Sequence, residues 1–251
     1  MRTCAYCGAS SRVTREHTFP NFLSKAYVDY RTYVDHTRGT LPRRSAPVTR
    51  DVCLACNGGP LSELDTYGAE LNRRYFSIPV DLPIRIHFCY RYNSLLRWLL
   101  KLFYNDSRTR SETTSAYSQF IPYILGKANH PPLVTTLFLG IIEPVETNAA
   151  EQARGLGPIL YPQVNRIGNL LIDSSDSIIL ARFIGFNSYL VTVLSWGEGS
   201  GRAFRRRIVR SKAWFNGMSE LLPGESEVLI QNGCVDTRRY LWATILNKKG
   251  R

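Results

Sequence analysis

Four cysteines in two identical pairs have the residue type and spacing for metal chemistry. Cys4 and Cys7 form one Cys-x-x-Cys pair, and Cys53 and Cys56 form the other. Two such pairs supply the four thiolates of a tetrahedral structural zinc and leave no coordination position open for a substrate. A zinc of this kind stabilises a segment that is too small to bury a core of its own. The pairs therefore predict a scaffolding zinc site, with redox use of the thiols as the alternative.

A second group of residues could carry out hydrolysis. A Glu16-His17 dipeptide lies between the two cysteine pairs, and Asn57 directly follows the last cysteine. Histidine can take a proton from water near neutral pH. Carboxylate and amide oxygens are ligands that a hard divalent cation such as Mg²⁺ or Mn²⁺ prefers. We therefore predict a catalytic divalent metal held by Glu16 and Asn57, with His17 activating the water that attacks a phosphodiester.

Taken together, these residues resemble the HNH endonucleases that have a ββα-metal finger and four zinc-binding cysteines. The matching residues are Cys4, Cys7, Glu16, His17, Pro20, Cys53, Cys56 and Asn57. The resemblance covers roughly residues 1–75. It implies that His17 is the general base, that Glu16 and Asn57 bind the catalytic metal and that the cysteines bind zinc. Similar proteins occur among bacterial defence and mobile-element genes, which implies DNA as the substrate and a role in antiviral defence.

One residue of the family pattern is absent. The family's middle asparagine usually lies a few residues before the second cysteine pair, where it fixes the loop that bears the histidine. Val48, Thr49 and Asp51 occupy that neighbourhood in this sequence. The alternative function is therefore a non-catalytic zinc-finger module that binds a nucleic acid or a protein partner.

Short elements on either side of the cysteines must position these residues. The pattern predicts strands over residues 12–17 and 48–53 and a helix over residues 60–75, which has apolar residues at helical spacing. Residues 21–50 are predicted to form a helical turn or two followed by a long basic loop. We place a domain boundary after residue 78, so that an HNH-like nuclease domain occupies residues 1–78.

Residues 79–251 carry no motif with an evident chemistry, and we predict a mixed α+β domain that recognises a substrate or a partner. Residues 94–104 form a wide apolar stripe that is typical of a core helix. From residue 133 onward, short apolar or alternating runs separated by turn residues predict a series of strands. The fold class is therefore α+β, with a small zinc-bound ββα-metal module followed by a mixed domain.

The charge of the chain favours a polyanionic partner. The formal net charge is +12 and the sequence pI is about 9.6. Six basic residues between positions 202 and 212 could bind phosphates, or else belong to the solvated edge of a strand or hairpin. They are Arg202, Arg205, Arg206, Arg207, Arg210 and Lys212.

The sequence also limits location and partners. No apolar run is long enough to span a membrane, and no signal peptide is evident at the N-terminus. We therefore expect a cytoplasmic protein with nucleic acid as its partner and no membrane partner. A regulatory protein partner and a homo-oligomer both stay open.

Overall fold

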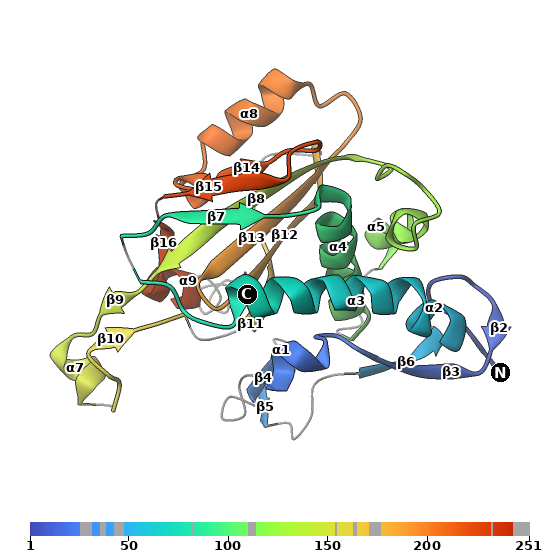
Figure 1. Cartoon of the computed structure of the whole chain (residues 1–251), viewed down its shortest axis with the longest axis horizontal. Helices are drawn as coiled ribbons and strands as arrows, with labels where there is room; N and C mark the ends of the chain where they lie inside the picture. The colour runs from blue at the N-terminus through green and yellow to red at the C-terminus, as the bar shows by residue number, and fades with distance from the viewer. Residues whose placement is uncertain are drawn as a thin grey trace. The chain divides into compact units, whose positions relative to one another are not determined.

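The structure of the protein is a computed structural model. It describes residues 1–25, 32–35, 39–42, 48–81, 83–109, 114–153, 155–162, 165–170, 177–231 and 233–242. The chain contains both helices and strands, in runs of one kind and then the other, which confirms the predicted α+β class (Figure 1). Among these residues, no helix is both long enough and apolar enough to cross a membrane.

The chain folds into two compact units. Unit 1 comprises residues 1–74 and 93–132, and unit 2 comprises residues 75–92 and 133–251. The domain boundary predicted from the sequence lies after residue 78. It would assign residues 93–132 to the second domain, whereas the structure places them in unit 1. The roles suggested for the two domains stay predictions.

Unit 1 contains the two predicted strands that flank the cysteines. β3 (Val13–His17) and β6 (Val48–Cys53) pair in antiparallel orientation, and the register shifts between Thr14 and Glu16. The β-branched residues of both strands suit this extended conformation. The other strands of unit 1 are β1 (Arg2–Thr3), β2 (Ser10–Ser11), β4 (Thr32–Asp35) and β5 (Gly39–Pro42), which form the pairs β1–β2 and β4–β5.

The predicted helix after the second cysteine pair is present in two parts. α2 (Leu54–Gly58) is followed by α3 (Pro60–Leu71), and a π-helical turn (Asn72–Phe76) comes next. The apolar positions of α3 are buried, as their spacing predicts. The remaining helices of unit 1 are α1 (Asn21–Lys25), α4 (Tyr92–Thr109), α5 (Ser115–Ser118) and α6 (Ile121–Ile124).

Helix α4 is longer than the apolar stripe over residues 94–104 predicts. Every residue from Trp98 to Ser107 is buried, including the polar residues Lys101 and Asn105. The helix continues through Asn105 because the polar side chains find hydrogen-bond partners within unit 1 and do not turn to solvent. Helices α3 and α4 approach closely at Gly68, where an added Cβ would lie 2.3 Å from Trp98 Cε2.

Unit 2 is built on a six-stranded sheet with the order β11-β12-β13-β8-β14, in which β16 also pairs with β8 in parallel (Figure 1). Its strands are β8 (Val134–Glu143), β11 (Asn165–Asn169), β12 (Ile178–Phe186), β13 (Tyr189–Trp196), β14 (Ser219–Leu221) and β16 (Gly233–Asp236). All residues of β13 are buried, as expected of a strand that is covered on both faces.

Smaller elements complete unit 2. They are β7 (Ile86–Cys89), β9 (Val145–Glu146), β10 (Ile159–Leu160), β15 (Glu227–Ile230), α7 (Ala149–Gln152), α8 (Arg202–Arg210), a 3-10 helix (Ala213–Phe215) and α9 (Thr237–Trp242). β7 pairs with β15, and β9 pairs with β10.

Candidate metal centre and the residues around it

The four cysteines of the two pairs meet at one point in unit 1. The Sγ atoms of Cys4, Cys7, Cys53 and Cys56 all lie within 4.8 Å of one another. The Sγ atoms of Cys7 and Cys53 are 3.7 Å apart. A tetrahedral zinc with Zn–S bonds of about 2.3 Å requires sulfur atoms about 3.8 Å apart. The cluster therefore has the donor set and the spacing to hold a zinc ion.

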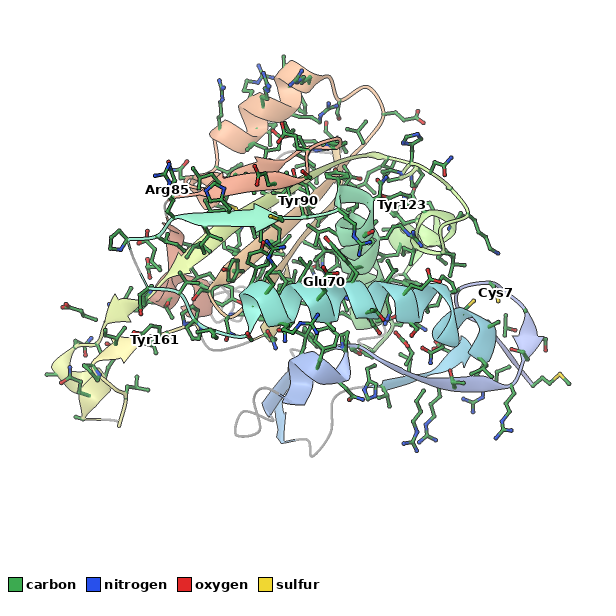
Figure 2. All side chains as sticks on the ribbon, viewed as in Figure 1. Cys7, Glu70, Arg85, Tyr90, Tyr123 and Tyr161 are labelled. Atoms are coloured by element: carbon green, nitrogen blue, oxygen red, sulfur yellow. The ribbon has the colours of Figure 1, made fainter. Side chains whose placement is uncertain are left out.

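A tight turn places the first pair. The Cys4 N–H donates to the Ala9 carbonyl at 2.9 Å, and the Gly8 N–H donates to the Cys4 carbonyl at 3.0 Å. Gly8 has a φ of 74°, a left-handed conformation that favours glycine. Cys7 lies in the loop that joins β1 and β2 and is exposed (Figure 2). The turn thus points both thiols of the pair to the same side.

The second pair is placed by the junction of a strand and a helix. Cys53 ends β6 and caps α2, since its Sγ accepts the Cys56 N–H at 3.4 Å. The Cys53 N–H donates in turn to Cys4 Sγ at 3.3 Å. Backbone N–H groups directed at sulfur stabilise thiolates, which are the form that binds a metal.

The thiols of the cluster differ in acidity. Burial raises the pKa of Cys4, but N–H groups of Cys53, Cys7 and Tyr6 outweigh it and lower that pKa to about 6. Burial and the neighbouring sulfurs raise the pKa of Cys56. A zinc ion would therefore displace a proton from Cys56, whereas Cys4 is already inclined to ionise.

Glu16 is buried and paired with a cation. Its side chain is 5% exposed, and its Oε1 lies 2.9 Å from Lys101 Nζ. The Lys101 ammonium also contacts Asp65 Oδ2 at 2.6 Å and donates to the Leu61 carbonyl at 3.3 Å. Three acceptors therefore match the three N–H donors of the lysine. Two carboxylates share this one ammonium.

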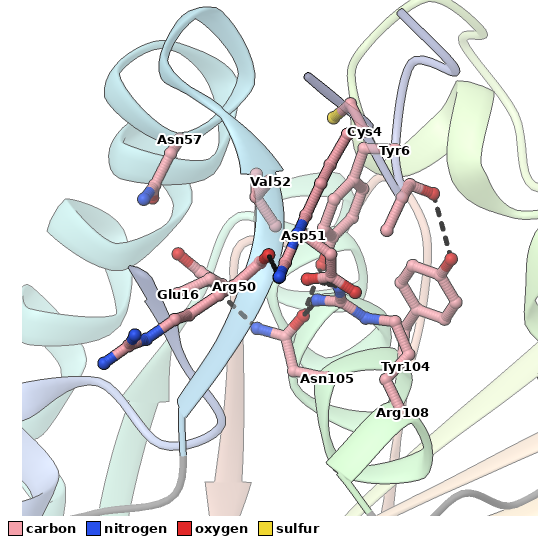
Figure 3. A network of polar contacts seen from close by, with 12 residues as sticks. Cys4, Tyr6, Glu16, Arg50, Asp51, Val52, Asn57, Tyr104, Asn105 and Arg108 are labelled. Atoms are coloured by element: carbon pink, nitrogen blue, oxygen red, sulfur yellow. Dashed lines mark hydrogen bonds and ion pairs between the residues drawn. The ribbon is translucent and has the colours of Figure 1, made fainter. Parts of the chain in front are cut away.

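Asn105 joins the Glu16-His17 dipeptide to the rest of unit 1 (Figure 3). Its Nδ2 donates to Glu16 Oε1 at 3.0 Å and to the His17 carbonyl at 3.1 Å. Its Oδ1 accepts from the Tyr6 hydroxyl at 2.7 Å and from the Arg108 guanidinium. Asn105 is fully buried, so these four contacts account for the whole hydrogen-bonding capacity of its amide.

Arg108 holds the other side of this network. Its guanidinium forms an ion pair with Asp51 on β6. It also lies over the rings of Tyr6 and Tyr104, with its central carbon 5.2 Å and 4.8 Å from their centroids. α4 is thereby attached to β6 and to the loop of the first cysteine pair.

His17, the predicted base, follows Glu16 at the end of β3. Its side chain is half-buried. Its Nδ1 is buried and has no hydrogen-bond partner within the part of the chain that the structure describes. Asn105 donates a hydrogen bond to the backbone carbonyl of His17. The backbone to which the imidazole is attached is therefore held in place.

Asn57 is oriented by β3. Its Nδ2 donates to Thr14 Oγ1 at 2.8 Å and to the Arg15 carbonyl at 2.9 Å. The Arg15 carbonyl can only accept, which identifies the atom facing it as nitrogen. The amide oxygen of Asn57 therefore takes no part in these two contacts and could bind a cation.

The predicted divalent-metal ligands, Glu16 and Asn57, are both held by other side chains or by the backbone. Both contacts described for the Glu16 carboxylate are made by Oε1, so Oε2 is the atom that could bind a cation. Glu16 lies on β3, and Asn57 is hydrogen-bonded to the same strand. Two oxygen donors with fixed supporting contacts suit a hard divalent cation. The residue types are those that such a cation prefers, while Lys101 already compensates the charge of Glu16.

The basic cluster between positions 202 and 212 is helical, which corrects the interpretation of it as the edge of a strand or hairpin. Arg202 to Arg210 form α8, and Lys212 follows it. Apolar residues of α8 (Phe204, Ile208 and Val209) pack against the buried cluster that includes Leu194 and Trp196. Nitrogen-tipped side chains project from the helix (Figure 2). Arg202, Arg206, Arg207 and Arg210 are exposed, while Arg205 and Lys212 are half-buried.

Sequence reasoning missed two residues of the site, Lys101 and Asn105. Both lie on α4, which the sequence places in the second domain. The signal for them was a lysine inside the apolar stripe and an asparagine four residues later, just after the stripe. A buried polar residue needs a partner, but the sequence does not show which one.

Known proteins give no further identification. No protein-family model, curated protein or solved structure matches the chain. The function must therefore be argued from the site itself.

Proposed function

We propose that this protein is a metal-dependent endonuclease of the HNH type that hydrolyses phosphodiester bonds of DNA. The observation that supports it is the joining of β3, β6 and α2 around one four-cysteine cluster, with Glu16-His17 on the strand and Asn57 on the helix. The same three residues are the ones to which the resemblance assigns catalysis.

The residues have separate roles in this proposal. His17 accepts the proton of the attacking water, since an imidazole has a suitable basicity near neutral pH. Glu16 and Asn57 would hold Mg²⁺ or Mn²⁺, which when bound polarises the scissile phosphate and stabilises its developing charge. Lys101 and Asn105 hold the carboxylate of Glu16 in place. The cysteines, with zinc bound, fix the end of β6 and the start of α2.

We assign substrate binding to the basic residues of the chain. The exposed arginines of α8 and the net charge of +12 support a nucleic-acid partner. DNA, a cytoplasmic location and a role in antiviral defence rest on the resemblance and the sequence. Binding of a regulatory protein and formation of a homo-oligomer are compatible with the proposal.

Nicking of supercoiled plasmid in Mg²⁺ and in Mn²⁺ tests the proposal. We expect cleavage by the wild type and a loss of at least about 100-fold in His17→Ala, with one zinc per chain retained. His130→Ala is the control, because His130 is an exposed histidine of unit 1. Failure of the wild type to cut in either metal would contradict the proposal, as would equal cleavage by the two variants.

One observation favours the alternative of a non-catalytic zinc-finger binding module. Glu16 is buried and its charge is already compensated by Lys101. A protein that uses this pair only for stability would bind DNA or a protein partner without cutting. DNA binding that is unchanged in His17→Ala, together with no cleavage, would support this alternative.

A further inference from the structure

Asn105 contacts two consecutive residues of the candidate site in different ways. It holds the carboxylate of Glu16 through Oε1 and the backbone of His17 through its carbonyl oxygen. A contact to a side chain and a contact to the next peptide together restrict both residues. We propose that Asn105 is the positioning residue for the Glu16-His17 dipeptide. This inference rests on the proposed function.

The orientation of the Asn105 amide is determined by its surroundings. If the amide were reversed, its oxygen would face the oxygens of Glu16 and His17, and its nitrogen would face the guanidinium of Arg108. The amide oxygen would then oppose two acceptors, and the amide nitrogen would oppose a guanidinium that can only donate. In the observed orientation every contact pairs a donor with an acceptor. The amide therefore has one stable arrangement.

The network also connects the dipeptide to the cysteine cluster. Tyr6 lies between Cys4 and Cys7, and its hydroxyl donates to Asn105. Tyr104, one residue before Asn105, donates through its hydroxyl to the Ala5 carbonyl at 2.9 Å. The rings of Tyr6 and Tyr104 pack edge to face with centroids 5.1 Å apart. The loop of the first cysteine pair thus supports the residue that supports the dipeptide.

The proposed reaction requires that Glu16 and His17 be held in accurate positions. A misplacement of about 1 Å in a reacting group can cost about 100-fold in rate. Partners that hold a metal ligand from behind typically contribute about 10- to 100-fold to affinity or activity. Asn105 is therefore expected to act on turnover through Glu16 and His17, with no contact of its own to substrate.

Asn105→Asp is the informative variant. It retains the size of the side chain and can still accept from Tyr6 and Arg108, but as a carboxylate it cannot donate to either residue of the dipeptide. Asn105→Ala removes all four hydrogen bonds and serves as a second variant. The matched control is Asn93→Ala on the same helix, where Oδ1 accepts the Tyr123 hydroxyl at 2.9 Å. All three variants must be compared at equal zinc content and at a temperature where each is folded.

The experiment has two readouts. The first is hydrogen exchange of the backbone amides from Arg15 to Thr18, which we expect to be at least about tenfold faster in Asn105→Asp than in Asn93→Ala. The second is plasmid cleavage in Mn²⁺, where kcat should fall about 10- to 100-fold in Asn105→Asp with KM unchanged. A general loss of stability would speed exchange along the whole of unit 1 and would not separate kcat from KM.

The outcomes distinguish the two proposals. Equal exchange in Asn105→Asp and Asn93→Ala would overturn the positioning role, and so would equal kcat in the presence of wild-type activity. If the wild type does not cut DNA at all, the proposed function fails, and the exchange readout still decides whether Asn105 holds the dipeptide. Faster exchange that extends evenly over unit 1 would also overturn the positioning role.

Discussion

The Asn105 amide donates a hydrogen bond of 3.0 Å to Oε1 of Glu16, a residue 89 positions earlier in the chain. The strand that carries Glu16 and the helix that carries Asn105 belong to the same compact unit. α4 is therefore part of the candidate site, although the resemblance to HNH endonucleases covers only the first 75 residues or so. The Glu16-His17 dipeptide is therefore held in place by a buried network.

Removal of a cluster cysteine is expected to release the zinc. Cys56→Ser should bind no zinc and should lower the stability of unit 1, because the metal-binding energy is part of the folding energy of such sites. Cys89→Ser should retain one zinc per chain, since Cys89 lies on β7 in unit 2. Elemental analysis of the purified variants checks both results. Zinc retained by Cys56→Ser would contradict the assignment.

Zinc binding should also weaken in acid. Protons compete for the thiolates, so affinity falls as the pH falls, and the proton that the bound metal displaced from Cys56 returns. A competition titration with a chromogenic chelator at pH 6 and pH 8 measures this. Affinity that is the same at both values would argue against thiolate ligands.

Replacement of Lys101 tests the shared ammonium. Lys101→Met leaves the buried carboxylate of Glu16 and the half-buried carboxylate of Asp65 without a cation, which should cost about 3–5 kcal/mol of unfolding free energy at pH 7. Burial already raises the pKa of Asp65, against the effect of Lys101. In the variant, the folded-state pKa of the Asp65 carboxyl should rise further above its unfolded value.

The pH dependence of this effect has a defined sign. A carboxyl whose pKa is raised on folding favours the folded state below its unfolded pKa, and this contribution is lost as the pH rises through the folded pKa. The deficit of Lys101→Met should therefore be smaller at pH 5 than at pH 7.5 in urea titrations. Lys127→Met, an exposed lysine in unit 1, should change stability by less than about 0.5 kcal/mol. A deficit that is larger at pH 5 would contradict this account.

The contact between α3 and α4 predicts a cost for a single methyl group. In Gly68→Ala the new Cβ would lie 2.3 Å from Trp98 Cε2, so Trp98 or a helix must move. We expect a destabilisation of about 1–3 kcal/mol, despite the better helix propensity of alanine. Gly58→Ala is the control, because its nearest neighbour would be Leu54 Cδ1 at 3.9 Å. The midpoint temperature of thermal unfolding of Gly68→Ala should be well below that of Gly58→Ala. The reverse order would contradict a close contact at Gly68.

The arginines of α8 are expected to bind phosphates. Arg206→Ala/Arg210→Ala should make the dependence of DNA affinity on salt shallower, by about 0.9 in log–log slope for each phosphate that the variant no longer neutralises. The control Arg85→Ala/Arg91→Ala removes the same charge from two other exposed positions of unit 2. Fluorescence anisotropy across a salt series measures both. Equal changes of slope in the two double variants would show that α8 has no special role.

Local patterns in the sequence predict the elements around the cysteines well. β6 spans residues 48–53 as predicted, because β-branched residues precede a helix start that Cys53 caps. Asn187, with a φ of 52°, lies in the turn between β12 and β13, a left-handed conformation that asparagine adopts more readily than most residues. In each case the information lies within a few neighbouring residues.

The support of the site could not be predicted in the same way. The sequence lacks an asparagine near Val48 and Thr49, where the family pattern places one, and the structure places Asn105 against the His17 carbonyl from 88 residues away. Which buried polar side chains meet is decided by tertiary packing. The helical state of Arg202 to Arg210 was likewise missed, since its many arginines obscure the apolar residues that pack inward.

Chemical rescue tests the central role of His17 most directly. His17→Gly removes the proposed base and leaves space for a small molecule, while the contacts of Glu16 with Lys101 and Asn105 remain. The measurement is the rate of plasmid nicking by zinc-loaded His17→Gly in Mn²⁺ as imidazole is added. The account predicts a rate at least about 100-fold below wild type that rises with imidazole concentration and follows the fraction of neutral imidazole as pH changes. Nicking by His17→Gly at the wild-type rate, or no nicking by the wild type itself, would contradict the account.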